Sequence, residues 1–156
     1  MTKLRMDIFD KEILKLLQTD NSLSTEVIGD RVGLSASACQ RRIKRLKSSG
    51  VIKQEVVLLD NTKLAGYVTV IVDITLERGG TKILDKLSSE LIKEPQVQQL
   101  YYMAGETDFT LIIASKNMDD FDNLCRTLFM SNPDIKKFTS KVVIKCQKTS
   151  LALPID

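Results

Sequence analysis

The sequence predicts an α+β protein, in which a winged helix-turn-helix domain precedes a ferredoxin-like βαββαβ domain. Two observations carry this prediction. Apolar residues in the first part of the chain recur at helical spacing, and one of these helical stretches is strongly basic. From Val68 onward the apolar residues alternate strictly with polar ones, which is typical of a strand with one buried face. We therefore expect a helix-turn-helix domain at 1–59, a connector at 60–67 and a ferredoxin-like domain at 68–156.

The first two helices follow from their apolar spacing and their end signals. The first is predicted from Asp7 to Gln18, because acidic residues in the first turn favour the helix dipole. Its apolar stripe consists of Ile8, Ile13, Leu16 and Leu17. Ser24 has the position of an N-cap for a second, short helix that ends at Arg31. The inward residues of that helix are Val27, Ile28 and Val32.

A turn and a third helix complete the helix-turn-helix layout. Gly33 stands where the turn between two helices needs a residue that tolerates positive φ. Ser35 then caps a helix that runs to about Ser48, and Gly50 ends it. The buried stripe of the third helix consists of Ala36, Cys39, Ile43 and Leu46. Helix, short helix, turn and helix in this order are the arrangement of a DNA-binding helix-turn-helix.

The third helix carries most of the positive charge. Seven basic side chains and no acidic one lie between Arg31 and Gln54, whereas the rest of the chain holds 16 basic and 20 acidic residues. A solvated helix face without a partner is the alternative, but such faces usually carry Glu for i,i+4 pairs. We therefore expect contacts with double-stranded DNA. Base or groove contacts are predicted for Ser35, Ser37, Gln40, Arg41 and Lys44, and phosphate contacts for Arg42, Arg45 and Lys47.

The segment after this helix has strand character. Residues 51–59 are rich in Val, Ile and Leu, so they form either the wing or an extended arm that leaves the domain. Residues 60–67 are polar and contain a glycine, which is typical of a connector.

The second domain is predicted element by element from its period and its breaks. Strands are expected at Val68–Leu76, Val97–Met103, Phe109–Ala114 and Thr139–Lys148, with Gly79-Gly80 ending the first. One helix carries Ile83, Leu84, Leu87 and Leu91 inward, and Asn117 caps another with Phe121, Leu124, Cys125 and Leu128 inward. Pro95 and Pro133 end the two helices. The two halves repeat, since Ile83 and Pro95 match Phe121 and Pro133 at the same offset.

The predicted sheet has one face that no helix of the chain covers. That face carries Ile71, Tyr101 and Val143 among polar residues. An uncovered and partly apolar face predicts association, so we expect at least a homodimer.

Several classes of function are disfavoured. The chain contains no histidine, and its three cysteines, Cys39, Cys125 and Cys146, lack metal-like spacing, so neither a catalytic site, a metal site nor a cofactor is expected. Each cysteine falls at an apolar position of its local pattern, so we expect all three to pack in the core. No apolar run is long enough to span a membrane, and the N-terminus lacks the pattern of a signal peptide. We expect a cytoplasmic protein without a membrane partner.

The combined motifs resemble the Lrp/AsnC (leucine-responsive, feast/famine) family of transcriptional regulators. They are Asp7-x-x-Asp10, Arg31-Val32-Gly33-Leu34-Ser35-x-Ser37, Arg41-Arg42-Ile43-Lys44-Arg45-Leu46, Gly50-Val51-Ile52 and Gly105-Glu106-Thr107-Asp108. The resemblance implies a DNA-binding regulator whose C-terminal domain forms oligomers, from dimers to tetramers or octamers, and senses a small molecule. It implies an amino acid, such as leucine or methionine, bound between subunits near residues 105–108.

The loop itself suits an amino acid on chemical grounds. Its backbone N–H groups at Gly105 suit a carboxylate, and the carboxylates of Glu106 and Asp108 suit an ammonium group. The alternative is a plain hairpin turn. The predicted effector residues are Met103, Ala104, Gly105, Glu106, Thr107 and Asp108. The chain departs from the family at Glu106, where aspartate is common, and at Thr107, where a larger residue is common.

Two other functions stay open. An architectural DNA-binding protein without an effector would show the same basic helix. Some haem-biosynthetic decarboxylases resemble the family in both domains, but the lack of histidine disfavours an enzyme.

Overall fold

The computed structural model describes residues 5–61, 63, 64, 66–77 and 80–156. The chain divides into two compact units. The first consists of Met1–Leu58 together with Lys148–Asp156, and the second of Leu59–Gln147. The last residues of the chain therefore belong to the N-terminal unit, which is the one feature of the division that residue order does not suggest.

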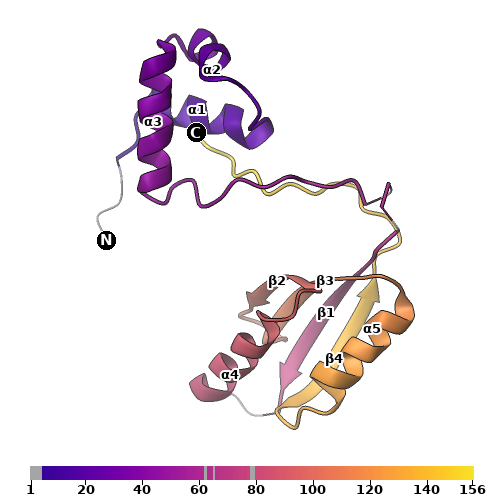
Figure 1. Ribbon diagram of the computed structural model, residues 1–156. Helices are drawn as coiled ribbons and strands as arrows, with labels where there is room; N and C mark the ends of the chain where they lie inside the picture. The colour runs from indigo at the N-terminus through magenta and orange to yellow at the C-terminus, as the bar shows by residue number, and fades with distance from the viewer. Residues whose placement is uncertain (1–4, 62, 65, 78–79) are drawn as a thin grey trace. The chain divides into compact units, whose positions relative to one another are not determined.

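Three helices form the first unit (Figure 1): α1 (Ile8–Thr19), α2 (Thr25–Val32) and α3 (Ala36–Ser48). Each helix begins after a capping residue whose side chain accepts a backbone N–H of the first turn. The caps are Asp7 for α1, Ser24 for α2 and Ser35 for α3. Gly33 adopts the left-handed conformation at φ 73°, as the turn between α2 and α3 requires. The buried core consists of Ile13, Leu14, Ile28, Cys39 and Leu46. The predicted helix-turn-helix is thus confirmed.

Two inward residues were predicted wrongly. Ile8 is 60% exposed and Val27 is 39% exposed. The inward face of α1 begins instead at Asp10, which is completely buried, and continues through Ile13 and Leu14. The inward face of α1 was misplaced because it begins with a carboxylate. A prediction from apolar spacing alone assigns such a residue to the surface.

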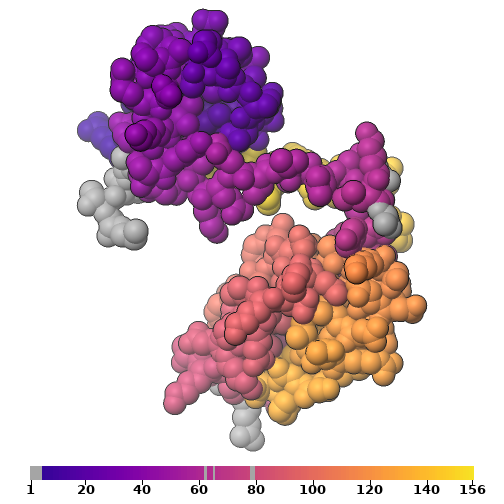
Figure 2. Space-filling model, viewed as in Figure 1, coloured from indigo at the N-terminus to yellow at the C-terminus, as the bar shows by residue number. Residues whose placement is uncertain are grey.

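Residues 51–59 form no strand, so the predicted wing is absent and the alternative of an extended arm is the one observed. The arm leaves the helical unit as an extended chain (Figure 2). Its consecutive apolar side chains, Val56, Val57, Leu58 and Leu59, are all exposed.

The second unit has the predicted order βαββαβ. Its elements are β1 (Val68–Leu76), α4 (Thr81–Leu91), β2 (Val97–Tyr102), β3 (Phe109–Ser115), α5 (Met118–Cys125), a π-helical turn (Arg126–Met130) and β4 (Ile135–Val142). The strands pair antiparallel in the order β2-β3-β1-β4, which is the ferredoxin-like topology. Of the predicted Gly79-Gly80 stop, Gly79 lies outside the described residues.

The last strand was predicted about five residues too late. It spans Ile135–Val142 rather than Thr139–Lys148. It begins early because Ile135 and Phe138 pack against the core, where the rings of Phe138 and Phe129 lie 5.2 Å apart. It ends at Val142 because its partner β1 has by then reached Val70, near its own start.

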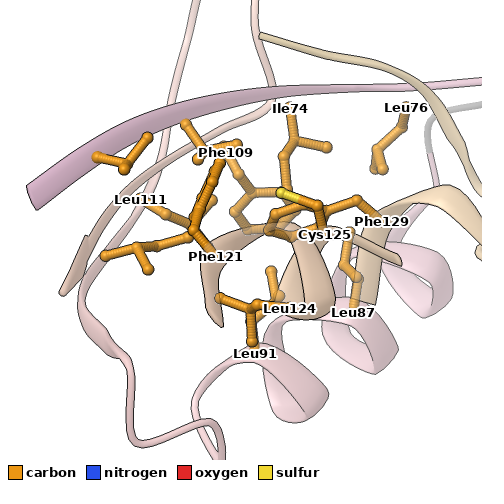
Figure 3. Close-up of a cluster of buried hydrophobic side chains, with 13 residues drawn as sticks. Ile74, Leu76, Leu87, Leu91, Phe109, Leu111, Phe121, Leu124, Cys125 and Phe129 are labelled. Atoms are coloured by element: carbon orange, nitrogen blue, oxygen red, sulfur yellow. The ribbon is translucent and has the colours of Figure 1, made fainter. Parts of the chain in front are cut away.

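Both helices cover one face of the sheet, as Figures 1 and 3 show. Alternate residues of β1 and β3 point into the core between sheet and helices, and the largest fully buried side chains there are Phe109 and Phe129. The opposite face carries Ile71 and Tyr101, as predicted, and the half-buried Asp73. Asp73 accepts hydrogen bonds from Thr110 and Lys141 on the neighbouring strands. Val143 lies just beyond β4.

Candidate nucleic-acid interface

Close packing of α2 against the turn sets the position of α3. Gly29 is buried, and a Cβ atom placed on it would lie 2.4 Å from the carbonyl oxygen of Leu34. Only glycine lets the two segments approach so closely. Ser35 then starts α3, where its hydroxyl oxygen accepts the N–H of Ala38 at 3.3 Å and lies 3.3 Å from the hydroxyl of Ser37. Ser35 therefore serves as a cap as well as a candidate DNA contact.

Four of the predicted contact residues project freely from α3. Ser37, Gln40, Arg41 and Lys44 are exposed. Arg41 and Lys44 form no ion pair with any residue that the structure describes. Their cationic groups are therefore available to an anionic partner such as the DNA backbone.

The other three basic residues of the predicted set have carboxylate partners inside the same unit. Arg42 lies 2.8 Å from both Asp7 and Asp10, and Arg45 also pairs with Asp10. Lys47 lies 2.7 Å from Glu55 on the arm. The basic face of α3 is thus divided into free cations and cations that hold α3 against its neighbours. A DNA contact by Arg42, Arg45 or Lys47 stays a prediction.

Asp10 is the centre of this arrangement. It is completely buried, and its carboxylate accepts hydrogen bonds from the backbone N–H of Asp7 as well as from the two arginines. Asp7 in turn accepts the N–H of Asp10 at 2.9 Å, so the two residues form a capping box at the start of α1. The Asp7-x-x-Asp10 spacing is visible in the sequence, but its link to α3 is not.

These contacts shift the pKa values of Asp7 and Arg42. The N–H of Asp10 and the nearby Arg42 guanidinium hold the pKa of Asp7 below its usual range. Hydrogen bonds to Asp10 and Asp7 raise the pKa of Arg42, whose guanidinium also lies 5.4 Å from the centre of the Phe9 ring. Asp7 and Arg42 are therefore both charged at neutral pH, and their pair binds α1 to α3.

The predicted effector loop lies between β2 and β3. Met103, Ala104, Gly105 and Glu106 are exposed, whereas Thr107 and Asp108 are half-buried. The backbone N–H groups at 104–107 have no hydrogen-bond acceptor among the described residues, so they are free for a carboxylate. Glu106 likewise has no partner in that part of the chain.

Asp108 also has a structural role, which its position in the loop sequence does not predict. Its carboxylate accepts the N–H of Leu76 at 2.8 Å, and its own N–H donates to Ile74 at 2.9 Å. The loop is thereby fastened to the end of β1. Of the two predicted carboxylates, only Glu106 is uncommitted within the described structure.

The described residues contain no cluster of metal-ligating side chains and no helix long and apolar enough to cross a bilayer. Cys39 and Cys125 are buried, as predicted, whereas Cys146 is exposed, contrary to the expected packing role. It lies beyond β4, where the predicted last strand would have buried it.

Both halves of the chain match known protein families. Residues 6–47 match the AsnC-type helix-turn-helix domain, and residues 69–153 match the Lrp/AsnC ligand binding domain. An uncharacterized HTH-type transcriptional regulator of Sinorhizobium fredii is 38% identical over 98% of this chain and 90% of its own length.

Solved structures agree. An AsnC family transcriptional regulator from Agrobacterium tumefaciens has a TM-score of 0.88 at 30% identity, over 96% of this chain and 97% of that one. A transcriptional regulator from Neisseria meningitidis, solved as a complex with L-Met, has a TM-score of 0.89 at 26% identity, over 97% of this chain and 98% of that one.

Proposed function

Because the chain belongs to the Lrp/AsnC family of transcriptional regulators, we propose that it controls transcription by placing α3 in the major groove of DNA. The observation that carries this proposal is the division of the basic face of α3. Arg41 and Lys44 are exposed and unpaired within the described residues, while Arg42 and Arg45 hold the helix in place through Asp10. A helix that is held to its own domain on one side and carries free cations on the other is suited to binding in the groove.

The contacts divide by chemistry. We propose that Ser37, Gln40 and Arg41 read base edges, since hydroxyl, amide and guanidinium groups can pair with bases in the major groove. Lys44 lies in the groove as well, where its ammonium group can pair with a base edge or a neighbouring phosphate. Ser35 caps α3 and, from the start of this helix, reaches the backbone of the DNA. Lys47, Arg45 and Arg42 form the edge of the interface and contribute through their positive field.

A gel-shift titration at several salt concentrations tests this proposal, with a 30-base-pair duplex that the wild-type protein selects from a random pool. The double variant Arg41→Ala/Lys44→Ala should bind far more weakly. Its dependence of log K on log salt should be shallower by about 0.9 for each phosphate that the variant no longer neutralises. The control is Lys136→Ala/Lys145→Ala, which removes the same charge from exposed lysines of the second unit. Equal binding by the two double variants would refute the interface.

We propose further that two copies associate through the uncovered sheet face. Ile71 and Tyr101 lie on that face, and a dimer would present two copies of α3 to one operator. Ile71→Asp should yield monomers in sedimentation equilibrium and weaken operator binding, whereas Thr149→Asp on the exposed tail should leave the dimer intact.

An amino acid is the proposed effector, bound at the 103–108 loop. Its carboxylate would accept the free N–H groups of the loop, and its ammonium group would pair with Glu106. The methionine complex of the Neisseria relative supports an apolar amino acid such as methionine or leucine. A thermal-shift screen of the twenty amino acids tests this, because a ligand at 100-fold its Kd stabilises by about 2.7 kcal/mol. No response to any of them would favour an architectural role.

The relatives are named transcriptional regulators, and no enzymatic activity is proposed. Since DNA is the proposed partner, we propose that the chain works in the cytoplasm of its cell.

A further inference from the structure

The C-terminal tail is part of the helical unit. Residues Lys148–Asp156 belong to the same compact unit as α1, α2 and α3, although they follow β4 in the sequence. The C-terminus lies beside α1 (Figure 1). The chain therefore passes between the helical unit and the sheet domain twice, first from Leu58 to Leu59 in the arm and again from Gln147 to Lys148.

Two contacts hold the tail. The side-chain amide of Gln18 donates to the carbonyl oxygen of Leu153 at 3.1 Å and accepts the N–H of Leu153 at 2.7 Å. The side chain of Gln18 thus bonds both backbone groups of Leu153. Two residues further on, Ile155 is half-buried against the core of the helical unit, while Leu151 and Leu153 are each 72% exposed.

Because these contacts lie at the end of α1, they can affect the start of the same helix. Gln18 lies in the last turn of α1, whereas Asp7 and Asp10 at its first turn hold Arg42 and Arg45 of α3. A helix of twelve residues is a rigid rod about 18 Å long. A group that fastens one end of α1 therefore also limits the motion of its other end, where the recognition helix is attached.

We propose that residues 148–156 form a strap that closes the helical unit and, through α1, fixes α3 for DNA binding. The strap is joined to β4 through residues 143–147, and the sheet domain to which β4 belongs carries the proposed effector loop. The strap is thus the second route, beside the arm, by which a change in the sheet domain reaches the recognition helix. This regulatory part rests on the proposed function, but the mechanical part does not.

Hydrogen exchange of the full-length protein, followed by mass spectrometry, tests the strap. In Ile155→Ser and in Gln18→Ala, the peptides of α1 and α3 should exchange about tenfold faster than in the wild type, and those of β1 and β3 at the wild-type rate. Leu151→Ser is the matched control, since this exposed tail residue has no partner in the described structure, and it should behave as the wild type. A chain that ends at Ser150 should show the largest effect.

DNA affinity provides the second readout. The Kd of Ile155→Ser for the selected duplex should rise three- to tenfold, with Leu151→Ser unchanged. Faster exchange confined to α1, with α3 exchange and DNA affinity unaltered, would show that the tail stabilises only the helix it contacts. That result would overturn the proposal. So would wild-type exchange in all strap variants. If the wild-type protein failed to bind DNA, the proposed function would fall, while α3 exchange would still decide on the strap.

Discussion

The guanidinium of Arg42 lies 2.8 Å from the carboxylate of Asp10, which is completely buried between α1 and α3. This pair gives part of the basic helix a structural role. A charged group that leaves water loses its hydration, and it is retained only where partners satisfy it. Asp10 has such partners, and they come from the helix that is proposed to bind DNA. Part of the positive charge of α3 therefore serves to hold the helix in place.

The first prediction concerns Asp10. Asp10→Ala should lower the free energy of unfolding of the helical unit by about 3 kcal/mol, because it removes the buried centre of the ion pairs and half of the capping box. Urea unfolding followed by circular dichroism measures the change. Glu12→Ala removes only an exposed pair with Lys15 on the same helix, so it should cost no more than about 0.5 kcal/mol. Equal effects of the two changes would contradict the structural role of Asp10.

The second prediction separates neighbouring arginines. Arg42→Ala should destabilise the helical unit, because Asp10 and Asp7 lose a partner. Arg41→Ala should leave stability within about 0.5 kcal/mol of the wild type, as surface substitutions usually do, but weaken DNA binding at least tenfold. Thermal unfolding and gel shifts on both variants test this. If Arg42→Ala impaired binding without loss of stability, Arg42 would be a direct DNA contact, as the sequence alone suggested.

The elements that could be predicted from the sequence are those set by interactions between near neighbours in the chain. Helix caps at Ser24, Ser35 and Asn117 are local, since each bonds a backbone group three residues away, and all three were predicted. The alternation of β1 was also visible, because one face of the strand is buried throughout. Both patterns depend only on near neighbours in the chain.

What the sequence did not reveal depends on contacts distant in the chain. Asp10 meets Arg42 and Arg45 across more than thirty residues, and the strap meets Gln18 across 135. The end of β4 is set by where β1 starts, not by its own apolar residues, which continue to Ile144. At the candidate site, residue type predicted the basic helix, but only the fold shows which cations are free.

The third prediction concerns Gly29. Gly29→Ala should destabilise the helical unit by about 2 kcal/mol, because the added Cβ would lie 2.4 Å from the backbone oxygen of Leu34 and would push α2 from the turn. Gly80→Ala is a suitable control, since its Cβ meets no atom within 4 Å among the described residues and its backbone is extended. Thermal unfolding of both variants measures the difference, and an unchanged melting temperature for Gly29→Ala would refute this account of the turn.

The fourth prediction separates structure from sensing at the effector loop. Asp108→Ala should cost about 2 kcal/mol, since the N–H of Leu76 loses a charged acceptor. Glu106→Gln should leave the melting temperature of the free protein unchanged but abolish the thermal shift that the amino-acid effector produces. A thermal-shift assay with and without L-methionine and L-leucine tests both. A retained shift in Glu106→Gln would remove Glu106 from the proposed site.

The fifth prediction concerns the three thiols. Burial, with a smaller effect of Asp122, raises the pKa of Cys125 to about 11, and burial also raises the pKa of Cys39. The thiolate is the reactive form, so both should resist iodoacetamide at pH 8 in the folded protein, whereas the exposed Cys146 should react quickly. Mass spectrometry after short labelling would identify the modified residue, and early modification of Cys125 would contradict its burial.

The same shift predicts a loss of stability in alkali. In the unfolded chain Cys125 ionises near its ordinary pKa of 9.0, but in the folded protein it holds its proton up to about pH 11. Between these values the unfolded state binds fewer protons, so the free energy of unfolding should fall as pH rises, by about 3 kcal/mol in total. Below pH 9 the thiol should have no effect on the slope. Urea unfolding of the wild type and of Cys125→Ala from pH 8.5 to 11 isolates this contribution, because all other titrating groups are shared. Parallel pH profiles for the two proteins would show that the thiol does not titrate differently on folding.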